Sequence, residues 1–195
     1  MPLLPNPKRR NPQSHQAILD ATVALLAEEG YAHMSIEAIA RRAGVSKKTI
    51  YRWWSSKAAV VMEAYMTNTA QEILVPDTGS IQKDLEQLFT QVFKILTTTP
   101  AGAAMSGIMV DAQTDPAIAQ LFREQFIVNR RAVTRQILER GIARGELQPD
   151  CDIECAIDTL YGPMWYRLLV GHQPLNSTFA QTLVKQVLAG IEKVR

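Results

Sequence analysis

Cysteine, histidine and long apolar runs are all scarce in this sequence. Its 195 residues include two cysteines and three histidines, too few for a disulfide framework or a zinc site. We therefore expect a reducing compartment, the cytoplasm, and no metal or other cofactor. The longest apolar stretch, 101–110, contains Ser106 and two glycines. It is far shorter than the ~20 residues that a membrane-spanning helix needs, so we expect no membrane partner.

Signatures of catalysis and export are also missing. The sequence has no glycine-rich phosphate loop and no Gly-x-Ser-x-Gly turn. Its close acidic pairs, such as Asp150/Asp152, fall at expected helix ends. The basic run Lys8-Arg9-Arg10 is not followed by an apolar segment, as a signal peptide requires. We therefore expect neither an enzyme nor a secreted protein.

Charge of one sign is not in excess overall, but it is unevenly placed. The formal net charge is +2. Residues 1–57 carry nine basic and four acidic side chains, a net charge of +5, and the remainder carries −3. Because net charge averages over position, the total does not exclude a polyanionic partner. The basic N-terminal quarter favours nucleic acid as that partner.

Apolar residues recur at helical spacing almost throughout, and no alternating strand pattern occurs. The sequence predicts an all-α fold of about nine helices. A break at 75–80, Val-Pro-Asp-Thr-Gly-Ser, marks the expected domain boundary. The expected helices cover 12–29 (ended by Gly30), 36–43, 47–53, 57–73, 81–96, 100–114, 116–143, 153–168 and 179–191.

Residues 35–57 are the most informative stretch. Ser35 and Ser46 are suitable N-caps for two short helices, which Ala43-Gly44-Val45 separates. Short helices joined by a tight glycine turn are typical of a helix-turn-helix, whose second helix enters the major groove. With Val45 and Ile50 facing the first helix, the outward side chains can read bases or hold phosphates. The predicted outward side chains are Lys47, Lys48, Thr49 and Arg52, with Tyr51, Trp53 and Lys57 near flanking phosphates.

These motifs together resemble the TetR family of transcriptional regulators. The resemblance rests on 29–31 (Glu-Gly-Tyr), 35–46, 49–54 (Thr-Ile-Tyr-Arg-Trp-Trp) and Ser56-Lys57, and on 141–147, Gly-Ile-Ala-Arg-Gly-Glu-Leu. It implies an N-terminal helix-turn-helix domain over 1–57, a connecting helix over 57–73, and an effector-binding and dimerisation domain over 74–195. The implied partners are double-stranded operator DNA, a small-molecule effector and a second copy of the chain.

The resemblance also assigns DNA contacts residue by residue. One departure from the family pattern is Trp53-Trp54, in place of a His or Tyr followed by Phe; simple packing is the alternative role for Trp53. Arg41 and Arg42 are expected to be a solvated helix end, and Lys8-Arg9-Arg10 either a tail or a DNA-binding arm. The expected DNA-binding residues are Ser35, Ser46, Lys47, Lys48, Thr49, Tyr51, Trp53 and Lys57.

In the C-terminal part, the expected helix over 153–170 is apolar on nearly every side. We therefore expect it to be buried on two faces, one of them against a partner. The expected dimer residues are Leu160, Met164, Leu168, Leu183, Val184, Val187 and Leu188. Methionines with aromatics suit an adaptable effector pocket, although the same pattern also describes plain core. The expected effector residues are Met62, Tyr65, Met66, Phe89, Phe93, Met105, Met109, Phe122, Phe126, Tyr161 and Trp165. Asp111 is expected to pair with the ligand or with Arg130 or Arg131.

The sequence therefore predicts a sequence-specific DNA-binding regulator. A repressor released from a palindromic operator by a small hydrophobic or aromatic effector fits best. Two alternatives stay open: a small all-helical ligand-binding protein or enzyme with no DNA role, and a non-specific architectural DNA-binding protein.

Overall fold

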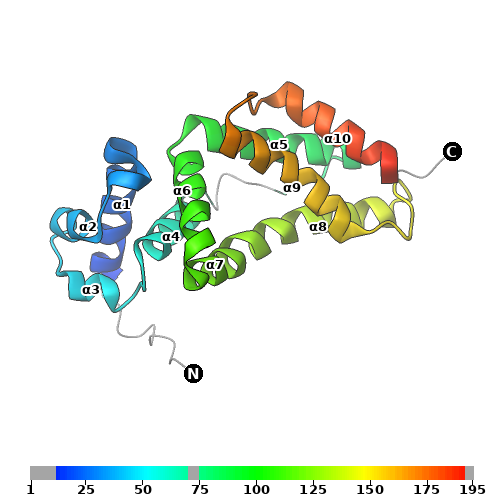
Figure 1. The fold of residues 1–195 in the computed structure, drawn as a ribbon. Coiled ribbons are helices and arrows are strands. Elements are labelled where there is room, and N and C mark those ends of the chain that lie inside the picture. The colour runs from blue at the N-terminus through cyan, green and yellow to red at the C-terminus, as the bar shows by residue number, and fades with distance from the viewer. Residues whose placement is uncertain (1–11, 70–74, 192–195) are drawn as a thin grey trace. The chain divides into compact units, whose positions relative to one another are not determined.

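The computed structural model describes residues 12–69 and 75–191, and in these ranges the regular secondary structure is entirely helical (Figure 1). The predicted all-α class is confirmed. Helices α7, α8 and the intervening π-helical segment η2 follow one another without a break, so the described ranges contain nine continuous helices, as predicted. The elements are α1 (Pro12–His33), α2 (Ile36–Arg42), α3 (Lys47–Tyr51), α4 (Lys57–Thr69), α5 (Ile81–Thr98), α6 (Ala101–Thr114), α7 (Pro116–Phe122), η2 (Arg123–Ile127), α8 (Val128–Ala143), α9 (Ile153–Val170) and α10 (Ser177–Ile191).

The described residues pack into two compact units. The first, here called the head unit, comes from the described residues within 1–70 and 103–125. The second, the body unit, comes from the described residues within 71–102 and 126–195. The predicted functional domains followed the chain, whereas the packing joins most of α6, and α7, to the N-terminal helices.

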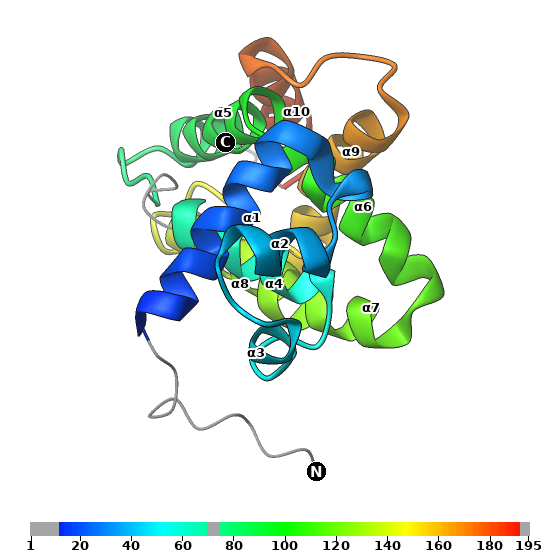
Figure 2. The ribbon, with the colours of Figure 1, turned by 90° about the vertical axis from the view of Figure 1, so that its left-hand side faces the viewer.

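The head unit is built on α1, whose predicted buried residues Ile18, Ala21 and Leu25 are buried. Gly30 interrupts this helix with φ 73° and ψ 166°, a backbone conformation that favours glycine. The regular helix thus ends where the sequence predicts, and a last turn continues to His33. Figure 2 shows α2 lying across α1, with α3 at the lower end of the same unit.

Tyr31, just after this kink, ties α1 to α6 within the head unit. Its hydroxyl donates a hydrogen bond of 2.5 Å to Asp111, a partner that was not predicted for this carboxylate. Burial and the nearby carboxylate both raise the pKa of Tyr31, which keeps the phenol protonated and able to donate. Gly107 permits the approach, because a Cβ there would lie 2.3 Å from the Tyr31 ring.

The body unit has a single apolar core formed by α5, α8, α9 and α10. This core contains most of the residues predicted for the dimer contact. Six of the seven residues proposed for it are buried inside their own chain, and only Leu168 is partly exposed. The periodicity correctly marked a buried face, but α5 of the same chain covers α10 there. The six buried residues are Leu160, Met164, Leu183, Val184, Val187 and Leu188.

The motif at 141–147 holds the start of α5. Gly145 turns the chain with φ 72°, and the carboxylate of Glu146 accepts a 2.9 Å hydrogen bond from the backbone N–H of Ile81. Arg144 lies 3.5 Å from the buried carboxylate of Asp84. The motif therefore has a structural role, because it satisfies an otherwise unpaired N–H at a helix N-terminus.

Removing the Tyr31 hydroxyl tests the link between α1 and α6. We expect Tyr31→Phe to lower the free energy of unfolding by about 1–3 kcal/mol, since it leaves the Asp111 carboxylate without a buried donor. Urea unfolding followed by circular dichroism measures the change. Tyr51→Phe is the matched control, because the Tyr51 side chain is exposed. Equal stability of the Tyr31 variant and the wild type would contradict this account.

Candidate DNA interface and effector pocket

The two predicted N-caps are present in the head unit. Ser35 accepts a hydrogen bond from the N–H of Ala38, and Ser46 accepts one from the N–H of Thr49, each at 3.1 Å. Gly44 provides the turn between the helices with φ 66°. Helices α2 and α3, with the turn between them, therefore form the helix-turn-helix that the capping serines and Gly44 predicted.

Helix α3 has one buried side chain, Ile50, which fixes its inner face. Lys47, Lys48 and Tyr51 are exposed, and 54% of Tyr51 is accessible. Thr49 is half-buried, and its hydroxyl lies 3.0 Å from that of Ser46. The structure thus places four of the predicted DNA-binding side chains, together with Ser46, on one short helix and its cap.

Lys47 has a partner on α2. Its ammonium group lies 2.7 Å from the carboxylate of Glu37, and both side chains are more than half exposed. The hydrogen bond to Lys47 lowers the pKa of Glu37, and the same bond raises the pKa of Lys47. A phosphate or base that recruits Lys47 must therefore compete with Glu37.

Two of the predicted DNA contacts have internal roles. Only 8% of Trp53 is exposed, and its ring packs edge-on against Trp54 at 5.6 Å between centroids. This burial favours the packing alternative for Trp53. Lys57 donates a 2.8 Å hydrogen bond to the backbone carbonyl of Tyr31, and its ammonium lies 4.1 Å from the centre of the Tyr31 ring. Lys57 therefore joins the start of α4 to the end of α1.

A three-residue bridge secures the chain just after α3. The indole N–H of Trp54 donates a 2.6 Å hydrogen bond to Glu63 on α4. His15 on α1 lies 2.7 Å from the other oxygen of Glu63, and its ring stacks on Trp54 at 5.2 Å. His15 and Glu63 were not among the predicted functional residues. The unusual tryptophan pair was the only signal, because His15 and Glu63 lie 48 residues apart.

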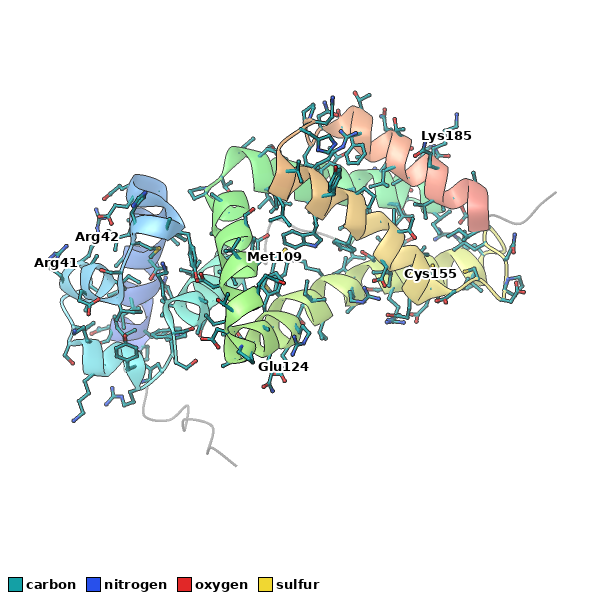
Figure 3. All side chains as sticks on the ribbon, in the orientation of Figure 1. Arg41, Arg42, Met109, Glu124, Cys155 and Lys185 are labelled. Carbon is teal, nitrogen blue, oxygen red and sulfur yellow. The ribbon has the colours of Figure 1, made fainter. Side chains whose placement is uncertain are left out.

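The arginines at the end of α2 differ from each other. Arg42 forms a two-pronged pair with Glu28 of α1, with N–O distances of 2.5 and 2.6 Å. Arg41 is exposed (Figure 3). Arg42 thus forms an exposed ion pair between α2 and α1, while Arg41 matches the expected solvated helix end. The Lys8-Arg9-Arg10 segment lies outside the described residues.

The expected effector residues are divided between the two units. In the head unit, Met62, Tyr65, Met105 and Phe122 are buried, and Met66 and Met109 are partly buried. In the body unit, Phe89 and Phe93 belong to the core. The remaining three, Phe126, Tyr161 and Trp165, line one pocket of about 340 Å³, together with Ile127, Arg130, Arg131, Asp158 and Gly162.

The two cysteines and the apolar helices were also considered as possible functional features. Cys151 and Cys155 are both free thiols, and burial raises the pKa of Cys151. Across the ranges 12–69 and 75–191, no helix combines the length and apolarity needed to cross a membrane.

This geometry defines a helix-turn-helix protein with a DNA-binding head, and comparison with known proteins specifies its family. A family model described as bacterial regulatory proteins, tetR family, matches residues 18–64. One described as the tetracyclin repressor-like C-terminal domain matches residues 75–187. The chain belongs to the TetR family, and it is a DNA-binding transcriptional regulator.

Individual relatives cover almost the whole chain. It is 38% identical over 183 residues to the HTH-type transcriptional regulator YdeS of Bacillus subtilis (strain 168), covering 94% of this chain and 92% of YdeS. It is 26% identical over 175 residues to the DNA-binding transcriptional repressor TetR of Mycobacteroides abscessus, covering 88% and 90%. The solved TetR family transcription regulator SCO0332 superposes with a TM-score of 0.80 at 32% identity, covering 91% of this chain and 98% of that one.

The Glu37–Lys47 pair predicts how the head responds to loss of one carboxylate. We expect Glu37→Gln to strengthen binding to a random-sequence duplex roughly two- to fivefold at low salt, since Lys47 is then available to phosphates. Fluorescence anisotropy at about 50 and 200 mM salt measures both affinity and salt dependence. Glu139→Gln, which makes the same charge change on the exposed side of α8, is the control. If both variants bind DNA alike, the pair does not restrain Lys47.

The bridge to Glu63 predicts different outcomes for the two neighbouring tryptophans. Trp54→Phe and Trp53→Phe each remove the same part of a buried ring, but only the first removes the hydrogen bond to Glu63. We expect Trp54→Phe to reduce the free energy of unfolding by about 1–3 kcal/mol more than Trp53→Phe. Equal losses in urea unfolding would show that the bridge contributes nothing beyond packing.

Proposed function

We propose that this regulator is a repressor that binds a two-fold symmetric operator as a homodimer and leaves it when a small apolar or aromatic effector binds. The observation that carries the DNA-reading part is α3, which is capped by Ser46, fixed by Ile50 and exposes Lys47, Lys48 and Tyr51. Repression is supported by the relative from Mycobacteroides abscessus, which is named as a repressor.

The exposed side chains divide into two roles. Lys48 and Thr49 suit base edges, since lysine donates to guanine and a threonine hydroxyl or methyl contacts several bases. Lys47 joins them once it leaves Glu37. Tyr51, at the other end of α3, suits a phosphate, which fixes register but carries no sequence information. Ser35 and Ser46 support these contacts by capping α2 and α3.

A homodimer follows from the symmetry of such an operator, in which each half-site takes one head. The buried apolar face of α9 is occupied by its own chain, so we place the dimer contact on the outer face. Tyr166, Leu169 and Val170 are 47–60% exposed there. Apolar side chains of this size are typical of surfaces that a partner covers.

Release of DNA requires that the effector bind one conformation of the dimer more tightly than another. The effector can shift the equilibrium only by this difference in affinity. The pocket formed by Phe126, Tyr161 and Trp165 is the proposed binding site, since it is mainly apolar and opens to solvent.

Selection from a library of random duplexes tests the DNA-reading role. We expect the full chain to enrich one two-fold symmetric sequence and to prefer it over random duplex by ~10³ or more. Thr49→Ala should change which bases are enriched, whereas Tyr51→Phe should weaken binding to selected and random duplexes alike. No enrichment would favour a non-specific architectural protein, and equal effects of the two variants would overturn the division of roles.

A further inference from the structure

The body-unit pocket combines an aromatic wall with guanidinium groups. Its volume of about 340 Å³ falls within the range of small-molecule sites in proteins. All of its lining residues belong to the body unit, and they lie at the end of η2, on α8 and on α9. The aromatic members are Phe126, Tyr161 and Trp165, and the charged members are Arg130, Arg131 and Asp158.

The π-helical turn η2 shapes one wall of this pocket. It interrupts the long helix formed by α7 and α8 at Arg123–Ile127, and its last two residues, Phe126 and Ile127, both line the pocket. A π-turn inserts a residue into the helical register and redirects side chains, and such turns occur frequently at functional sites. The irregular backbone of η2 therefore forms part of the pocket wall.

Contacts within the body unit hold the aromatic wall in place. The hydroxyl of Tyr161 lies 3.0 Å from that of Thr134 and donates to the backbone carbonyl of Arg130 at 3.2 Å. Trp165 meets Phe126 edge to face, with ring centres 6.3 Å apart. Because these rings are already ordered, a flat ligand loses little free energy to side-chain ordering when it binds.

The charges in the lining favour an anion. Arg131 forms ion pairs with Asp158 and with Glu154, so the one carboxylate of the lining already faces a guanidinium. The guanidinium of Arg130 lies 5.6 Å from the centre of the Phe126 ring, at the aromatic wall itself. Two guanidinium groups against one carboxylate give the lining a net positive charge.

We propose that this pocket binds a small aromatic anion, with its ring system against Phe126, Tyr161 and Trp165 and its carboxylate or sulfonate on Arg130. An aromatic cage alone also suits a quaternary ammonium cation. The guanidinium over Phe126 disfavours a cation here, because it places a like charge at the same ring. The identification of such an anion as the effector rests on the proposed function, whereas its binding to this pocket does not.

Two matched dyes test the ligand class directly. 8-Anilino-1-naphthalenesulfonate is an aromatic anion, and N-phenyl-1-naphthylamine has the same ring system without the sulfonate. We expect isothermal titration of the full chain to show the sulfonate bound at one site per chain, at least about tenfold more tightly than the neutral dye. Equal affinity for the two dyes, or tighter binding of the aromatic cation ethidium, would overturn the proposal.

Arginine variants locate the binding. Arg130→Gln should weaken binding of the sulfonate about tenfold or more and leave the neutral dye within about twofold, since only the charged contact is lost. Arg135→Gln is the control, because Arg135 lies on α8 and pairs with Glu154 but does not line the pocket. Thermal unfolding of each variant establishes that it is folded. Equal loss of sulfonate binding in both variants would place the dye elsewhere.

These measurements contain no DNA, so their failure is distinguishable from failure of the proposed function. A chain that binds the sulfonate through Arg130 but selects no DNA sequence would refute the DNA-reading role and retain the ligand class. A chain that selects a symmetric duplex but binds the two dyes equally would refute the ligand class alone.

Discussion

The shortness of the recognition helix is the constraint on which the DNA-binding head depends. Helix α3 has five residues, whereas isolated helices below ~12–15 residues are marginal in water. The surrounding structure must therefore hold it. Ser46 caps its start, Ile50 anchors its middle, and the hydrogen bond from Trp54 to Glu63 secures the chain just after its end. Lys48 and Tyr51 are exposed on this helix, which is why we propose them as DNA contacts.

The basic residues of the head are also partly held by contacts within the protein. The excess of positive charge over residues 1–57 is partly paired on the head surface, where Glu28 holds Arg42 and Glu37 holds Lys47. The first pair joins α1 to α2, and the second joins α2 to α3. Exposed pairs of this kind are screened by salt and contribute little to stability. Their clearer consequence is to orient the cations and to make their availability to phosphate depend on competition.

Local chemistry in the sequence predicted the head well, and long-range contacts explain what it missed. Serine caps, the turn at Gly44 and the break at Gly30 each depend on a few neighbouring residues, so the sequence alone was sufficient for them. The bonds of Tyr31 to Asp111 and of His15 to Glu63 span 80 and 48 residues. No local pattern indicates such pairs.

Burial patterns were less informative about what covers a surface. Helical periodicity correctly identified the apolar faces of α9 and α10, but it does not distinguish a face covered by α5 from one covered by a second chain. The pattern therefore anticipated the burial of the predicted dimer residues, but not which chain covers them. The body-unit pocket contains three of the residues expected to bind an effector, Phe126, Tyr161 and Trp165. Arg130 and Arg131 were not among the expected residues, because the π-turn and the packing of α8 on α9 create the site.

The claim that α3 reads DNA can be tested most directly by photocrosslinking. The side chain of Lys48 is replaced with p-benzoylphenylalanine, and the protein is irradiated on a duplex selected from a random library. The same replacement at Lys185, exposed on α10 of the body unit, is the control (Figure 3). The account predicts crosslinks from position 48 to bases within each half-site and none from position 185. Crosslinks from position 185 with none from position 48 would contradict it.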